Sequence, residues 1–307
     1  MSDFAAIQTA LSGLLAHRQA LETIGHNVAN AATEGYSRRR VDFAAATGGT
    51  VPALFSKPRL SGNGVEIVGT TRIRDALLDA RVRSEVAAKA RLDAEVDAFD
   101  RLEMALPEPS DTALAAQLGD FWAAWHDVAN QPTELATRAA LIEQGRTLTS
   151  ALNHAGLQIE NARNDVVAQT EATIADANAL AARIADLNEA IRSAVAAGLQ
   201  PDDLRDQRDS LVEKLTGLVG GTARENTDGT VDVFVGGTAY VRGDRAAALE
   251  LREGPDATTP DVGSPFLKVQ AAWVGAEGTV PVDDGTVGGL LHAVNDVFPR
   301  YLAQLDD

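Results

Sequence analysis

Apolar residues recur at intervals of three and four through the first thirty positions of the chain. This spacing places their side chains on one stripe of an α-helix. Few charges accompany the stripe, so the helix alone in water would be marginal, with an apolar face that lacks a partner. We therefore predict an amino-terminal helix over residues 1–33 whose stripe is made of Phe4, Ile7, Leu11, Leu14, Leu21, Ile24 and Val28.

The pattern changes after this first helix, where helical spacing gives way to turn residues. Glu34, Gly35 and Tyr36 are typical of a turn, and an extended piece follows at residues 65–68. We predict an extended connector over residues 34–74 with little strand content. Glycine and proline punctuate it at Gly48, Gly49, Pro52, Pro58, Gly62 and Gly64.

Helical spacing then resumes and predicts an elongated bundle over residues 75–217. Its longest run contains no proline between Pro132 and Pro201, and a helix of that extent would be about 95 Å long. Such a helix cannot lie inside a compact globule. A shorter helix before it carries Trp122 and Trp125 on one amphipathic face, which we expect to be a buried packing face rather than a sugar-binding platform.

A small β subdomain is predicted over residues 218–281, because two-residue alternation replaces helical spacing there. A turn-forming Asp-Gly pair precedes the alternating residues Val231, Val233 and Val235. Helical spacing returns over residues 282–307 as the start of a returning helix that is truncated. The predicted fold is mainly α with a small β subdomain, organised as an elongated helical bundle that contains one very long helix.

Composition and charge exclude several classes of function. The formal charge of −17 disfavours nucleic acid and anionic membranes as partners, because both require clustered positive charge. The nearest basic cluster is Arg38, Arg39 and Arg40, which we interpret as solvated or locally paired. The chain has no cysteine, which excludes disulfides and thiolate metal sites.

The sequence also indicates no membrane insertion. The opening residues lack the basic and apolar regions of a cleavable signal peptide, and no later run of about 18 apolar residues is present. These features are typical of a cytoplasmic protein, but a protein exported by a machine that reads no such signal would have the same features.

Candidate reactive residues are scattered rather than clustered. The five histidines lack metal-ligand spacing, and no phosphate-binding or nucleophile motif is present. A run of aspartates alternates with two arginines, which predicts a solvated helix face with ion pairs three and four residues apart. We therefore predict no enzymatic activity, no cofactor and no metal. The aspartates of the run are Asp202, Asp203, Asp206 and Asp209.

Residues 20–38 closely resemble the amino-terminal signature shared by the axial rod and hook proteins of the bacterial flagellum. In that family an apolar helix is followed by Asn-Ile/Val-Ala-Asn and then by a Thr-x-Gly-Tyr-x-Arg turn. Two asparagines can hydrogen-bond backbone groups where the helix ends, and a glycine relieves the turn sterically. The expected helix-exit signature is Asn27, Asn30, Gly35, Tyr36 and Arg38.

Among those axial proteins the chain looks most like the hook-associated protein 1 family, the subunits of the hook–filament junction. The resemblance extends along nearly the whole chain, in motifs at residues 64–67, 72–78, 204–211 and 287–291. The Leu-Arg-Asp-Gln-Arg-Asp run is the most discriminating of these motifs. Rod and hook subunits are largely β outside their terminal helices, whereas a helical bundle is predicted here.

The resemblance implies a structural subunit that is needed for filament assembly at the hook–filament junction. It implies an extracellular location on the flagellum, reached by export without a cleavable signal peptide. The expected partners are further copies in a homo-oligomer ring, the hook protein, the next junction protein and an export chaperone. The seven stripe residues of the first helix then become the expected assembly interface.

The family also has a carboxy-terminal helix that pairs with the amino-terminal one. No such helix is found in this sequence, so we expect the chain to be truncated at its carboxy terminus. Two alternatives remain open at this point: another hook or rod axial subunit, and an unrelated coiled-coil scaffold protein.

Overall fold

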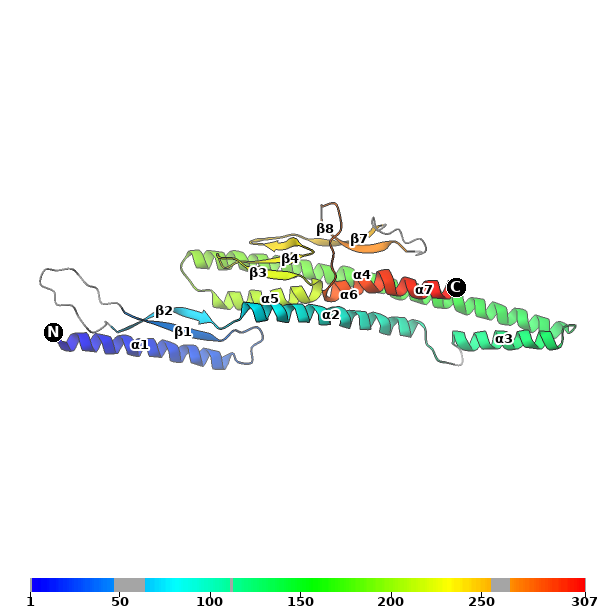
Figure 1. Ribbon diagram of the computed structural model, residues 1–307, viewed down its shortest axis with the longest axis horizontal. Helices are drawn as coiled ribbons and strands as arrows, with labels where there is room; N and C mark the ends of the chain where they lie inside the picture. Colours follow the sequence, from blue (N-terminus) through cyan, green and yellow to red (C-terminus); the bar gives the residue numbers. More distant parts are fainter. Residues whose placement is uncertain (1, 47–63, 111–112, 255–265, 307) are drawn as a thin grey trace.

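The computed structural model describes residues 2–46, 64–110, 113–254 and 266–306. The molecule is elongated, with its helices running along the length and the strands of the β subdomain on one side (Figure 1). This arrangement confirms the predicted fold class, mainly α with a small β region.

Helix α4 (Leu135–Ala196) is the spine of the molecule. Its 62 residues extend over about 93 Å. Helices α2 (Ala76–Ala105), α3 (Leu114–Asn130) and α5 (Asp202–Val219) lie alongside it (Figure 1). Among the described helices, none combines the length and apolar character that crossing a bilayer requires.

The apolar core lies where α4, α5 and the carboxy-terminal helices meet the β strands. Ile159, Ile184 and Leu215 are fully buried in it. No described residue before Ala94 belongs to this core. The amino-terminal part of the chain is therefore attached to the body by something other than apolar packing.

The β subdomain consists of short antiparallel strands laid on α4. Strands β3 (Thr222–Glu225), β4 (Val231–Val235), β5 (Thr238–Arg242) and β6 (Arg245–Ala246) form one sheet. Strands β7 (Leu249–Gly254) and β8 (Lys268–Trp273) form another. The alternating valines predicted for this region all point into the core from β4, as the two-residue period requires.

The last helical part consists of α6 (Gly285–His292), a π-helical turn η1 (Ala293–Val297) and α7 (Phe298–Asp306). Helix α6 packs closely on α2 because it presents glycine there. A Cβ atom on Gly289 would lie 3.0 Å from the Cβ atom of Ala94 and closer still to a backbone oxygen of α2. The Gly-Gly pair of this segment is thus a packing requirement.

The amino-terminal part contains α1 (Ser2–Ala29) and a β-hairpin of β1 (Arg39–Ala45) and β2 (Val65–Arg72). The expectation of little strand content was wrong, because these strands pair with each other in antiparallel register. The pairing is between segments far apart in sequence, which local pattern does not reveal. The predicted turns at Gly48, Gly49, Pro52, Pro58 and Gly62 lie outside the described residues.

The expected burial of the tryptophan face was also wrong. Trp122 and Trp125 are each 54% exposed, and α3 contains no buried residue. Among the described elements, α3 packs mainly on the amino-terminal part of α4, at one end of the molecule (Figure 1). Two helices alone leave the flank of an amphipathic face in solvent, because burial requires a third element.

Asn188 joins the helical spine to the β subdomain. Its side chain is buried, donates to the carbonyl oxygens of Val231 and Gly243 at 2.8 and 2.7 Å, and accepts from the amide of Val231 at 2.9 Å. Asn188→Ala would leave the buried amide and carbonyl groups of Val231 and the part-buried carbonyl group of Gly243 without partners, so we expect the free energy of unfolding to fall by about 3 kcal/mol. Urea denaturation would measure it, with the exposed neighbour Glu189→Ala as control. A loss no larger than that of the control would contradict this role.

Candidate assembly site

The apolar stripe of α1 is open to solvent along its whole length. All seven residues predicted for it are between 52% and 75% exposed, and the structure adds Leu15, also 52% exposed, which sequence spacing missed. Leu15 is adjacent to Leu14 in sequence, so it lies beside the three- and four-residue series and makes the apolar stripe wider, not longer. An apolar surface of this continuity on one helix is typical of an interaction site.

The opposite face of α1 packs on the hairpin through small residues. Ala16 is buried there against β1, where Val41 is also buried. The amide of Val65 donates to the hydroxyl of Ser12 at 3.2 Å. Small side chains allow the helix and hairpin to approach closely, and the large apolar side chains are consequently left on the outside.

The helix-exit residues connect α1 to the hairpin. Asn27 donates to the carbonyl oxygen of Arg39 at 2.8 Å and accepts from its amide at 2.9 Å, so the side chain pairs with β1 as another strand would. The Tyr36 hydroxyl donates to the same Asn27 oxygen at 2.9 Å. Asn30 donates to the carbonyl oxygen of His26 at 3.0 Å. These bonds fix the angle between α1 and β1.

The remaining two signature residues act through their backbone. Gly35 has a φ of +77°, and a Cβ atom there would lie 3.1 Å from the Cβ atom of Ser210 on α5. The Arg38 carbonyl oxygen accepts from the amide of Ile73 at 2.8 Å, which extends the hairpin pairing, while its side chain is exposed. The turn therefore has to be compact because it touches the body.

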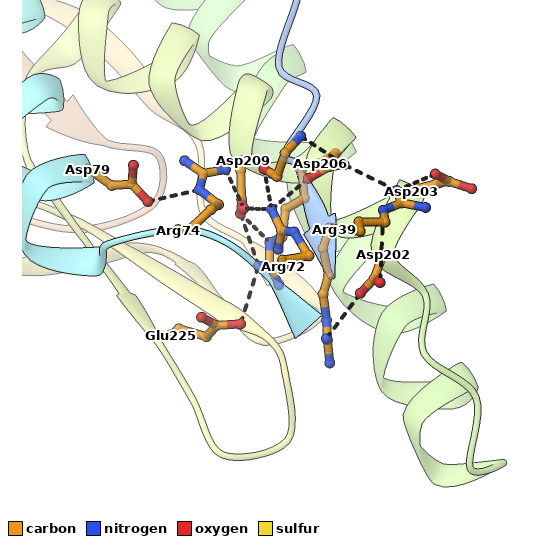
Figure 2. Close-up of polar contacts among 12 residues, drawn as sticks. Arg39, Arg72, Arg74, Asp79, Asp202, Asp203, Asp206, Asp209 and Glu225 are labelled. Atoms are coloured by element: carbon orange, nitrogen blue, oxygen red, sulfur yellow. Dashed lines mark hydrogen bonds and ion pairs between the residues drawn. The ribbon is translucent and has the colours of Figure 1, made fainter. Parts of the chain in front are cut away.

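Arginines from the hairpin meet aspartates from α5 just beside this turn (Figure 2). Arg39 lies 3.2 Å from Asp206, and Arg72 lies 2.8 Å from the same carboxylate. Arg72 also pairs with Asp209 at 2.5 Å. We call this group the Arg–Asp joint; its members are Arg39, Arg72, Arg74, Asp202, Asp203, Asp206 and Asp209.

Contacts of Arg74 and Arg208 connect the joint to its surroundings. Arg74 donates to Asp209 at 2.9 Å and to Asp79, in the first turn of α2, at 2.8 Å. Arg208, on α5, is fully buried and donates to Asp209 at 3.0 Å and to the carbonyl oxygen of Gly229. The joint is thereby connected to both α2 and the β subdomain.

These contacts overturn two interpretations made from sequence. The aspartate run is not a solvated face, because Asp202 and Asp206 are buried. Arg39 is not merely solvated or locally paired, because its partners lie more than 160 residues away in sequence. The sequence contains one signal for the joint: the arginine-containing motif at residues 72–78 and the aspartate-containing motif at residues 204–211 both resemble motifs of the same family.

The charges of the joint shift the pKa values of its members. Burial alone would raise the pKa of Asp209, but Arg208, Arg72 and Arg74 outweigh it and hold this pKa below its ordinary value. Burial alone would lower the pKa of Arg39, but hydrogen bonds to aspartates outweigh it and the pKa is raised. Burial dominates at Asp202 and raises its pKa despite the nearby arginines.

An elongated helical body with a joined amino-terminal helix that displays an uncovered apolar stripe defines a subunit built for assembly. The chain belongs to the family described as the flagellar hook-associated protein FlgK helical domain, whose model matches residues 99–307. The model of the flagella basal body rod protein family matches residues 7–36. The rod model thus covers only the first helix and the turn after it.

Curated relatives agree with this family. The chain is 31% identical to flagellar hook-associated protein 1 of Bacillus subtilis over 76% of this chain and 48% of the relative. It is 28% identical to the Escherichia coli protein of the same name, over 93% and 51% respectively. The chain therefore spans about half the length of the curated relatives it matches.

A solved structure agrees as well. The flagellar hook junction protein FlgK from Burkholderia pseudomallei superposes with a TM-score of 0.57 at 26% identity, over 71% of this chain and 39% of that one. The likeness in fold and the likeness in sequence thus point to the same family.

We expect Asp206→Asn to loosen the attachment of the hairpin to α5. The substitution weakens a charged hydrogen bond from Arg39 and an ion pair with Arg72 at once. A charged hydrogen bond with little solvent exposure is worth about 1.5–3 kcal/mol. Amide hydrogen exchange in β1 and β2 should become about 10-fold faster, which corresponds to about 1.4 kcal/mol. Asp186→Asn is the control, since Asp186 is an exposed carboxylate on α4 that is not part of the joint. Equal exchange in both variants would contradict the assignment.

Acid should weaken the protein partly through Asp209. The folded-state pKa of this group lies below its unfolded value of about 3.9, so its contribution is present above pH ~4 and is lost as the pH falls through the folded pKa. The free energy of unfolding should therefore fall more steeply below pH ~4 in the unmodified protein than in Asp209→Asn. The contribution of Asp202 has the opposite sign and is common to both proteins. Parallel curves from urea titrations across that range would contradict the expectation.

Proposed function

We propose that this chain is part of a structural subunit of the bacterial flagellum that forms the junction between hook and filament and is needed for filament assembly. Family membership supports the flagellar assignment. The observation that carries the assembly role is the uncovered apolar stripe of α1. The helix-exit signature supports the role by holding that helix at a defined angle on the hairpin.

The stripe is large enough to drive association. Fully burying a leucine or isoleucine side chain contributes about 1.5–3 kcal/mol. Since each stripe residue is already partly covered by its neighbours, burial of the seven would supply on the order of 5–10 kcal/mol. Part of this energy would offset the loss of rotational and translational freedom on association. Repeated contacts around a ring would add to it.

The partners we propose are further copies of the chain in a homo-oligomer ring, the hook protein and the next junction protein. An export chaperone would keep the apolar stripe from aggregating before assembly. We also propose an extracellular location on the flagellum, reached by export without a cleavable signal peptide. No catalytic role is proposed, since the relatives are hook-associated proteins.

The two alternatives have less support. A hook or rod axial subunit shares only the first helix and its turn with this chain, because the rod family model matches residues 7–36. An unrelated coiled-coil scaffold would require no relationship to the helical domain family, which matches most of the chain.

Leu14→Asp and Leu21→Asp, made singly in the full-length gene, should abolish incorporation at the hook. Each places a charge in the apolar stripe, where association would have to desolvate it. In a strain that lacks the native gene, we expect complete hooks and filament monomers shed into the medium. Gln19→Asp is the control, because it adds the same charge to an exposed polar position of the same helix.

Electron microscopy of cells would count hooks and filaments, and circular dichroism of the purified variants would confirm that the helical body remains folded. Normal filaments in both leucine variants would refute the proposed interface. Absent hooks would favour the hook or rod alternative.

A further inference from the structure

The amino-terminal part, here called the assembly unit, consists of α1, β1 and β2. Since residues 2–72 are contiguous, one covalent crossing, at residues 73–75, joins the unit to α2. The described apolar core begins only at Ala94, so it does not bridge the two parts. The contact between them is polar and is centred on the Arg–Asp joint (Figure 2).

The aspartates of the joint form a ladder along one face of α5. Asp202, Asp206 and Asp209 are four and three residues apart, so each lies one helical turn, about 5.4 Å, from the next. Arg39 touches two neighbouring rungs, 3.9 Å from Asp202 and 3.2 Å from Asp206. Arg72 lies 2.8 Å from Asp206, the rung that Arg39 also contacts, and 2.5 Å from Asp209. Both arginines therefore share the middle rung.

The ladder is not saturated with hydrogen bonds. Within the described residues, Arg39 Nε, Arg72 Nε and Asp206 Oδ1 are buried without a hydrogen-bond partner. Asp206 Oδ1 lies close to Arg72, but without hydrogen-bond geometry. A buried group left in this state costs about 1–3 kcal/mol. Because some hydrogen-bonding groups of the joint have no partner already, the arginines can change aspartate partners without disrupting a fully hydrogen-bonded network.

Residues of the joint line two cavities. A cavity of about 590 Å³ separates His26 and Glu34 of the assembly unit from Arg183 on α4. A second cavity, of about 460 Å³, lies between Thr70 of the unit and Arg205 on α5. These cavities can take up a small tilt of the assembly unit, while the turn at Gly35 stays in contact with Ser210 of α5.

We propose that the Arg–Asp joint is a hinge with discrete settings, in which Arg39 and Arg72 exchange between neighbouring rungs of the α5 ladder. A shift of either arginine toward Asp202 tilts the assembly unit one way, and a shift toward Asp209 tilts it the other way. Stepwise movement of one element past another by a helical turn is a known form of conformational change. The hinge would let one chain fit between two unlike neighbours, and this use rests on the proposed function.

Distances between spin labels on the two parts would test the hinge in the full-length protein. The 307 residues contain no cysteine, so Gln19→Cys on α1 and Ala175→Cys on α4 label exposed positions within them uniquely.

Asp209→Asn removes one end of the ladder and Asp202→Asn the other, so they should shift the mean distance between the two labels in opposite directions. Asp206→Asn, which removes the shared rung, should broaden the distribution. Asp186→Asn, which removes an exposed carboxylate from a wall of the larger cavity, should leave the distances unchanged.

Raising the ionic strength from about 0.05 M to about 0.5 M should broaden the distribution reversibly, because part of the joint is accessible to solvent. A single narrow distance shared by all variants and both salt concentrations would overturn the proposal. Complete loss of hydrogen-exchange protection throughout β1 and β2 in Asp206→Asn, beyond the roughly 10-fold increase in exchange expected for this variant, would also overturn it, since the joint would then be a folding contact. These measurements use the free protein, so their failure is distinct from normal filament growth in Leu14→Asp, which would refute the assembly role instead.

Discussion

The pairing of hairpin arginines with the aspartates of α5 is the interaction on which the arrangement of the whole molecule depends. Together with the hydrogen bond from the Thr70 amide to Gln200 and the ion pair of Glu34 with Lys214, it holds the amino-terminal helix and the helical body in a defined relation, because the described apolar core lies entirely in the body. Ion pairs with little solvent exposure contribute modestly to net stability, since desolvation opposes their attraction. They are directional, however, because the planar guanidinium group donates in fixed directions, and so they specify orientation better than an apolar patch does. The joint therefore determines the orientation of the amino-terminal part on the body more than it stabilises the contact between them.

Small side chains are buried and most large apolar side chains are exposed in both α1 and α2. In α1 the small residues face the hairpin and the large apolar residues face solvent. In α2 the buried residues include Ala87, Ala94 and Ala98, whereas Val96 and Phe99 are exposed. Alanine faces permit close approach within the chain, and the larger side chains remain available outside it. A subunit built in this way has more apolar surface than it needs for its own fold, as an assembly component should.

Sequence periodicity predicted the elements well where they are local. The proline-free run became one continuous helix, α4, and the alternating valines became the buried face of β4. Periodicity was less reliable for predicting which elements pack or pair with one another. The tryptophan face of α3 was expected in a core, but periodicity reports only that a face is apolar and not whether a third element covers it. The hairpin of β1 and β2 was missed because strand pairing across a long connection leaves no local period.

The sequence by itself determined the helices, the position of the β subdomain, the apolar stripe and the family to which the chain is similar. These features follow from spacing and from short motifs, which local backbone geometry translates directly into structure. Only the tertiary structure decided that Asp202 and Asp206 are buried and that the partners of the aspartate run are Arg39, Arg72 and Arg74. Charged residues in a sequence look the same whether they face water or each other, because their pairing depends on contacts between segments that the chain brings together only when it folds.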